Sequence, residues 1–194
     1  MWDEQQLGEY IDAHFTCELF RLETLPHYQV ATNGGDLARY LAGEPGPDMT
    51  RKGPWLDVIR GEVARGLHTY RVHVVHGPLS DYLRFEFEWG YTYNEQAGEH
   101  IRILDLAEQP RPDGLIDEDF WLISGRLDRG EPDRAAKMHY DSAGRYLGAE
   151  PADAADAADI ARYQRAREAA WSAAVPFGDY WQAHPQYWRA HRAA

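Results

Sequence analysis

Short runs with the pattern of β-strands recur through the middle of the chain, and they restrict the fold more than any other feature. Tyr70, Val72 and Val74 alternate with polar residues, which is the period-two pattern of a strand. Further runs are apolar or alternating and are bounded mainly by Gly, Pro or Asp: Phe20–Thr24, Ile101–Leu104, Phe120–Ser124, Lys137–Asp141 and Tyr146–Ala149. The sequence therefore predicts an α/β fold with a single mixed sheet of about five short strands, and an α+β arrangement is the alternative.

Helical patterns flank these runs. Two short helices are predicted at residues 3–14 and Asp36–Leu41, and a third begins at Pro54, because proline suits the first position of a helix. An Ala-rich helical pattern covers Ala152–Ala174. We therefore expect an α/β core domain of residues 1–150 and a C-terminal helical extension, residues 151–194, that packs on the same domain. The aromatic tail Pro176–Ala194 is expected either to fold back on the domain or to form an interface.

Composition and charge exclude several classes of protein. The chain has 194 residues, enough for one domain with a real core, and a formal net charge of −12. This charge repels phosphate backbones and anionic lipids, so direct binding to nucleic acid or a membrane is not expected. No apolar run approaches the roughly 18 residues of a membrane span, and the acidic N-terminus lacks the pattern of a signal peptide. We therefore expect a cytoplasmic protein.

The segment Pro78–Glu99 is the most site-like part of the chain, and it supports two interpretations. Aromatic and apolar residues occupy alternate positions along it, which favours a strand. Its ends favour a helix, because Ser80 suits an N-cap and Gly98 suits a C-terminal stop. We prefer the helix over residues 80–97, which places Glu86 and Asn94 within the apolar face. A carboxylate at such a position must be paired, protonated or directed at a ligand.

Charged and aromatic residues in and after this segment form the candidate ligand-binding site. They are Tyr82, Arg84, Glu86, Trp89, Asn94, Glu99 and Arg102. In the preferred interpretation, the two arginines and two glutamates satisfy one another as a structural ion-pair network. In the alternative interpretation, they form the polar base of a pocket for a small ligand, with Tyr82 and Trp89 as its walls.

Common catalytic and metal-binding motifs do not occur in the sequence. The candidate acid/base groups are Glu86, Glu99 and His139, although His139 is better explained as an ordinary strand residue. The acidic run Asp117–Asp119 is interpreted as a solvated turn, with a cation site as the alternative. We therefore predict neither a metal nor a cofactor.

Several motifs follow one another in a characteristic order between Phe15 and Tyr180. They are Phe20–Glu23, Leu41–Glu44, Pro78–Glu86, Asn94–Arg102, Asp117–Leu122, Met138–Asp141 and Gly148–Glu150. In this order they resemble a large actinobacterial family that is described only as a domain of unknown function. Members of that family are often encoded beside helix-turn-helix regulators. The resemblance therefore implies a regulatory role with a DNA-binding protein as partner.

A weaker similarity concerns only the order of the predicted elements, which resembles one half of the phospholipase D-like fold. Phospholipase D chemistry needs a His two residues before a Lys. Thr50 and Ala135 stand at that spacing before Lys52 and Lys137, the only lysines. This catalysis is therefore excluded.

Three functional hypotheses follow. The first is a non-enzymatic regulatory or small-ligand-binding protein that acts with a protein partner such as a helix-turn-helix regulator. The second is an enzyme that acts on a small molecule and uses Glu86 or Glu99 as an acid/base group. The third is an interaction protein that forms a homodimer through its aromatic tail.

Overall fold

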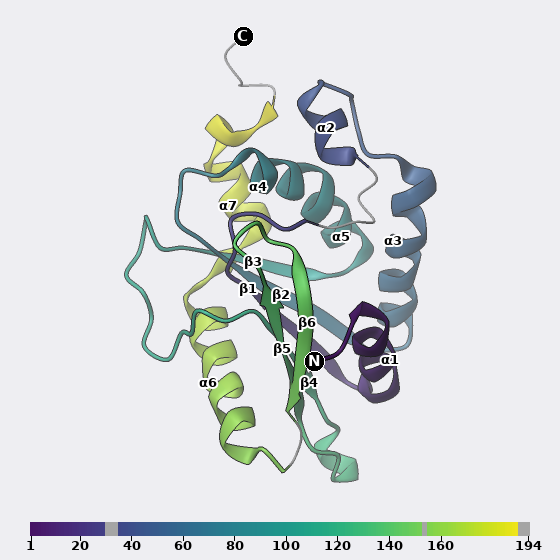
Figure 1. The fold of residues 1–194 in the computed structure, drawn as a ribbon. Coiled ribbons are helices and arrows are strands. Elements are labelled where there is room, and N and C mark those ends of the chain that lie inside the picture. Colours follow the sequence, from purple (N-terminus) through teal and green to yellow (C-terminus); the bar gives the residue numbers. More distant parts are fainter. Residues whose placement is uncertain (30–34, 153–154, 190–194) are drawn as a thin grey trace.

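A mixed β-sheet forms the centre of the molecule (Figure 1). The computed structural model describes residues 1–29, 35–152 and 155–189. Across these residues the sheet has seven strands in the order β6-β5-β4-β1-β2-β3-β7. The strands are β1 (Glu18–Glu23), β2 (His68–Val75), β3 (His100–Asp105), β4 (Phe120–Ser124), β5 (Arg134–Tyr140), β6 (Tyr146–Ala152) and β7 (Val175–Pro176).

The predicted fold class is confirmed, and the predicted number of strands is wrong. Seven strands are present in the described residues instead of about five, and the last of them, β7, has only two residues. A pair of residues is too short to show alternation, so the sequence pattern could not predict β7. Strands β1, β2 and β3 run parallel, and the remaining neighbours in the sheet run antiparallel.

Helices fill the crossovers that parallel strands require. The crossover from β1 to β2 contains α2 (Asp36–Leu41) and α3 (Met49–Ala64), and the crossover from β2 to β3 contains α4 (Asp81–Phe85), the π-helix η2 (Glu86–Tyr91) and α5 (Thr92–Ala97). Helix α1 (Glu4–His14) precedes β1. After β3 come the short 3₁₀ turn η3 (Leu127–Arg129), α6 (Ala157–Ala173), α7 (Phe177–Ala183) and the 3₁₀ turn η4 (Pro185–Tyr187). In the part of the chain that is described, none of these helices has both the length and the apolar character needed to cross a membrane.

Helix α3 begins earlier than predicted. The side chain of Asp48 accepts a hydrogen bond from the N–H of Thr50 and caps the helix, so Pro54 lies inside it. The prediction that Pro54 occupies the first position is therefore wrong. The proline removes one backbone donor from the interior of the helix, and the cap and the burial of Leu56 and Ile59 favour the longer helix.

The segment from Ser80 to Gly98 is helical, as preferred from its ends. The Ser80 hydroxyl accepts the N–H of Leu83, and Gly98 ends α5 in the left-handed conformation at φ 114°. Between these caps the chain forms α4, η2 and α5 without a break. The wide turn η2 closes with the N–H of Thr92 donating to the carbonyl of Phe87. Such π-turns occur frequently at functional sites.

Each face of the sheet packs against different helices. Phe20, Leu22, Tyr70 and Val72 lie on one face and pack against the buried side of α6. The opposite face packs against α4, η2 and α7 through Val75, Ile101 and Ile103 among others. Because side chains alternate along a strand, the residues between the apolar positions of β1 and β2 point toward this second face.

The C-terminal region belongs to the same body as the core. Strand β6 runs past residue 150, and β7 extends the sheet beside β3. Phe177 and Tyr180 of α7 are buried in the cluster that contains the aromatic residues of η2. The Tyr180 hydroxyl donates to Asp105 over 2.7 Å. The aromatic tail, as far as Arg189, therefore folds back on the domain.

Candidate functional site

Four ionisable side chains lie on the second face of the two middle strands. Arg21 and Glu23 come from β1, and Arg71 and His73 come from β2. Glu23, Arg71 and His73 are buried, and Arg21 is half-buried. They lie here because the alternate positions of both strands are filled by the apolar residues that face α6.

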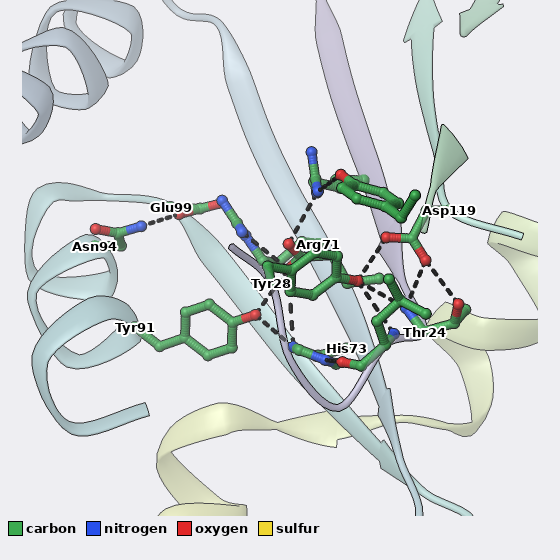
Figure 2. A network of polar contacts seen from close by, with 12 residues as sticks. Thr24, Tyr28, Arg71, His73, Tyr91, Asn94, Glu99 and Asp119 are labelled. Atoms are coloured by element: carbon green, nitrogen blue, oxygen red, sulfur yellow. Dashed lines mark hydrogen bonds and ion pairs between the residues drawn. The ribbon is translucent and has the colours of Figure 1, made fainter. Parts of the chain in front are cut away.

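Arg71 is the centre of a buried ion-pair network (Figure 2). Its Nε lies 2.6 Å from Glu99 Oε1, and its Nη1 lies 2.9 Å from Glu23 Oε2. The second oxygen of Glu23 lies 2.9 Å from Arg21 Nε. Despite the cost of burial, the neighbouring guanidinium groups hold the pKa of Glu23 well below its usual range. Glu23 therefore stays ionised inside the protein.

Tyr91 and His73 extend this network toward the end of β1. The Tyr91 hydroxyl donates to Glu23 over 2.7 Å and also lies 2.7 Å from His73 Nδ1. His73 Nε2 lies 3.0 Å from the carbonyl oxygen of Leu25, which can only accept, so this nitrogen carries a proton. Burial lowers the pKa of His73. These contacts fix η2 against the sheet.

Asp119 forms a second buried polar cluster at the start of β4. Its Oδ1 accepts hydrogen bonds from the N–H and the hydroxyl of Thr24 over 2.9 and 2.6 Å, and its Oδ2 accepts one from Tyr28 over 2.5 Å. The interpretation of Asp117–Asp119 as a solvated turn is therefore wrong for Asp119, which is buried. Its role is to hold the end of β1 against β4.

A cavity of about 370 Å³ lies between α3 and the helical segment α4–η2–α5. We call it the Lys52 cavity, and its main lining residues are Lys52, Trp55, Phe85, Glu86, Trp89 and Asn94. Arg71 also reaches it from the sheet, and Asp36 and Arg51 stand among its lining residues as an ion pair of 2.6 Å. The cavity thus has aromatic walls and a polar base.

Glu86 has an unusual position in this cavity. No residue in the described part of the chain forms a hydrogen bond with its carboxyl group. Burial, and after it the nearby charge of Glu23, raises the pKa of Glu86, while Lys52 and Arg71 act in the opposite direction. A Cβ atom at Gly90 would lie 2.5 Å from Glu86 Oε1, so the glycine provides the space for this carboxyl group.

A second cavity, also of about 370 Å³, lies on the other side of Glu86 and Arg71. We call it the Arg21 cavity, and it is lined mainly by Arg21, Tyr28, Tyr82, Trp121, Met138 and Tyr140. Arg21 lies over the ring of Trp121, 4.8 Å from its centroid, and donates to the hydroxyl of Tyr140 over 3.0 Å. Glu86 and Arg71 line both cavities.

Comparison with protein families places the whole of this arrangement in one family. The model of a family described as a domain of unknown function, DUF6879, matches residues 5–182. The chain belongs to this family. The match includes the Arg71 network, the Lys52 cavity and, apart from Glu4, the residues that line the Arg21 cavity, and it confirms the resemblance to a domain of unknown function. Among curated proteins, no match is found.

Four of the predicted ligand-binding residues line the cavities of this DUF6879 chain. Glu86, Trp89 and Asn94 line the Lys52 cavity, and Tyr82 lines the Arg21 cavity. Glu99 lies behind them, where its two oxygens accept from Arg71 and from the amide of Asn94 over 2.6 and 2.8 Å. Glu99 therefore belongs to the structural network.

The remaining predicted residues lie elsewhere. Arg84 donates to the carbonyl of Leu79 and lies over the ring of Tyr187. Arg102 points to the other face of the sheet, where it donates to Trp171 O over 2.9 Å and stacks on the same tryptophan. His139, near the edge of the sheet, lies 3.2 Å from Glu150. The predicted pairing of Arg84 and Arg102 with Glu86 and Glu99 is therefore wrong, and Arg21 and Arg71 form the network instead.

Sequence reasoning missed the residues that the middle strands and α3 contribute. The sequence pattern marks Arg71 as a polar position of an alternating strand and Glu23 as part of a strand-like run and of a family motif, and Lys52 enters only as evidence against a motif. A useful signal was present, because a charged residue in a strand covered by helices on both faces must be paired or directed at a ligand.

Within the described ranges, His, Cys, Asp and Glu side chains do not gather into a group of three that could hold a metal.

Proposed function

We propose that this protein binds a small molecule in the Lys52 cavity and acts, without catalysis, as a regulatory module. The observation that carries the proposal is the carboxyl group of Glu86, which lines two cavities and has no hydrogen-bond partner among the described residues. Glu86 is half-buried, and its carboxyl oxygens are open to these cavities. A group that faces a cavity without a partner is therefore suited to receive one from a ligand.

The pairing of the surrounding charges supports this proposal. Glu23 and Glu99 are held by Arg71, and Arg21 is held by Glu23. The observed ion-pair network therefore includes these four side chains but not Glu86. The volume of about 370 Å³ also falls within the range of about 300–1,000 Å³ that is typical of small-molecule sites.

The regulatory part of the proposal rests on the family resemblance to actinobacterial proteins that are encoded beside helix-turn-helix regulators. A DNA-binding regulator is the proposed partner, and the formal net charge of −12 suits a protein that contacts the regulator rather than the DNA. The homodimer hypothesis loses part of its support, because Phe177 and Tyr180 of the aromatic tail are buried within their own domain.

An enzyme that uses Glu86 as its acid/base group is the second candidate function. It is favoured by one observation: burial raises the pKa of Glu86, and perturbed carboxyl groups in clefts are typical of catalytic sites. Glu99 is a poor candidate for the same role, because both of its oxygens accept hydrogen bonds from Arg71 and Asn94.

The proposal is tested by a thermal-shift screen of common metabolites against the wild type, a Gly90→Leu variant and a Gly61→Leu control. Gly90 lines the cavity, whereas Gly61 is an exposed glycine of α3 with no atom within 4 Å of a Cβ built on it. We expect some compounds to stabilise the wild type and the control but not the Gly90→Leu variant, whose folding is checked by circular dichroism. Equal stabilisation of both variants would contradict the proposed site.

A further inference from the structure

We propose that the ligand of the Lys52 cavity is a zwitterion of the α-amino acid class, with its carboxylate bound by Lys52 and its ammonium group bound by Glu86. This inference rests on the proposed function and names the chemistry of its ligand. It follows from two charged groups that line one cavity and that have no ion-pair partner in the part of the chain that the structure describes.

Lys52 is the available cation of the cavity. Its ammonium group donates to Asn94 Oδ1 over 3.3 Å, and none of the carboxylates in the described residues lies within 4 Å of it. An ammonium group has three donors, so two remain for a ligand. Burial lowers the pKa of Lys52. A ligand carboxylate beside it would restore the stabilisation that burial removes.

Glu86 is the available anion. It lines the same cavity as Lys52, and each group favours the charged form of the other without forming an ion pair. Gly90 keeps open the space in which the carboxyl group lies. A ligand ammonium group has the charge and the donors that Glu86 lacks in the protein.

The other charges around the cavity are already neutralised. Arg71 contacts Glu23 and Glu99, and Arg51 contacts Asp36 and Asp48 at 2.6 and 3.4 Å. Among the described residues that line the cavity, one cation and one anion therefore remain without an ion-pair partner. A ligand that carries one charge of each sign compensates both. A purely anionic ligand would cover Glu86 without pairing it, and a purely cationic ligand would cover Lys52 without pairing it. Either is costly, because the ligand displaces water from these half-buried groups.

Aromatic side chains define the rest of the cavity. Phe85 and Trp89 are buried, and Trp55 stands at the wall contributed by α3. Trp89 is further held by edge-on contacts with Tyr40 and Phe85 at centroid distances of 5.4 and 6.0 Å. These walls suit the apolar side chain of an amino acid, since ligand pockets are lined mainly by such residues.

The test is a calorimetric titration of the full chain with each of the twenty L-amino acids, followed by two capped forms of every amino acid that binds. N-acetylation removes the positive charge of the ligand, and conversion to the carboxamide removes its negative charge. We expect each cap to weaken binding at least about tenfold, because a hydrogen bond between charged groups contributes about 1.5–3 kcal/mol and 1.4 kcal/mol corresponds to a factor of ten.

Two variants assign the two ends of the ligand. In Lys52→Met the free amino acid and its carboxamide should bind equally, and in Glu86→Gln the free and N-acetylated forms should bind equally. Lys137→Met and Glu95→Gln are the matched controls, since neither residue lines the Lys52 cavity, and both should keep the wild-type preference. If a variant fails to fold, the titrations of the wild type with the N-acetylated and carboxamide forms still test whether both charges of the ligand contribute to binding.

The results distinguish the proposed ligand-binding function from the narrower inference that the ligand is a zwitterion. If no amino acid binds at 10 mM, or if both caps leave the affinity unchanged, the zwitterion inference is overturned. In that case, metabolites that stabilise the wild type but not Gly90→Leu would still support a ligand-binding cavity. If no amino acid binds and no metabolite stabilises the wild type more than Gly90→Leu, both the proposed function and the inference are overturned.

Discussion

Glu86 shows most clearly how a single residue can be placed from sequence. Its position on the apolar face of a capped helix predicted a carboxyl group that must be paired, protonated or directed at a ligand, and it lines both cavities. Asn94, which was predicted on the same face, and Trp89, which was proposed as a wall of the pocket, also line the Lys52 cavity. The side chain of Arg84 instead lies over Tyr187, a contact between residues far apart in the sequence that no local pattern reveals.

The stability of the protein should depend on pH through Glu86. Burial raises the pKa of Glu86 in the folded state above the value of about 4.3 expected in the unfolded chain. Its ionisation therefore costs stability as the pH rises above that value. We expect Glu86→Gln to have a higher Tm than the wild type at pH 8 and an equal Tm at pH 4, as measured by differential scanning calorimetry.

The matched control for this measurement is Glu9→Gln, because Glu9 is an exposed glutamate of α1. It should change the Tm little at either pH. A Glu86→Gln variant that is less stable than the wild type at pH 8 would show that the ionised carboxylate is stabilised by the protein, contrary to this expectation.

Arg71 should be the residue with the greatest effect on stability. Its replacement by methionine leaves Glu23 and Glu99 buried without their common partner. We expect Arg71→Met to lower the free energy of unfolding by about 3–5 kcal/mol, which is the usual cost of breaking a buried ion pair. Arg60→Met, at an exposed pair with Asp57, should change it by less than about 1 kcal/mol. Urea denaturation that gives equal values for both variants would contradict the central role of Arg71.

Among the elements, the segment from Ser80 to Gly98 was predicted correctly as a helix, but its π-helical turn was not predicted. Its caps outweighed the alternating aromatic pattern, and they identified a helix correctly. The turn η2 was not predicted, because a hydrophobic period of 3.6 residues contains no information on a single wider turn. Packing of Phe87 and Tyr91 against α7 and the sheet favours this turn, and such contacts exist only in the folded molecule.

Gly90 should be coupled energetically to Glu86 within this element. Alanine normally stabilises a helix interior by about 1 kcal/mol relative to glycine. At Gly90 the added Cβ would lie 2.5 Å from Glu86 Oε1 and must displace the carboxyl group. We expect Gly90→Ala to gain less stability than Gly61→Ala in the wild type, and to gain the same amount once Glu86 is replaced by alanine.

A double-mutant cycle at Gly90 and Glu86, measured by urea denaturation, checks this coupling. A coupling energy of zero would show that the carboxyl group does not occupy the space beside Gly90.

For the molecule as a whole, local patterns predicted the elements but not their arrangement. The middle strands follow from alternation, and the fold class follows from the order of strands and helices. The ion-pair network of Arg71 does not follow from local patterns, because Arg71 contacts Glu23, 48 residues earlier in the chain, and Glu99, 28 residues later. Only the parallel order of β1, β2 and β3, with helices over both faces, brings these side chains together.

The end of the described chain also contributes to the whole molecule. Arg189 lies over the rings of Tyr40 and Trp89, forms an ion pair with Glu88 and donates to the carbonyl of Glu44. We expect Arg189→Met to lower the free energy of unfolding by roughly 1–2 kcal/mol, from the loss of the stacking and hydrogen bonds.

Arg145→Met provides the comparison for this variant, since Arg145 is exposed and contacts only Asp141 through its side chain among the ion pairs of the described residues. It should have an effect below about 0.5 kcal/mol in the same urea experiment. Equal effects of the two variants would show that the tail does not stabilise the helices around Trp89.

Ligand binding in the Lys52 cavity is tested most directly by the NMR signals of the indole N–H groups, during titration with the metabolite that stabilises the wild type most. Trp55 and Trp89 line the cavity, whereas Trp171 stacks on Arg102 at the opposite face of the sheet. Saturable shifts of the Trp55 and Trp89 signals, with the Trp171 signal unmoved, are the expected result. Unchanged Trp55 and Trp89 signals at saturation would show that the ligand binds elsewhere.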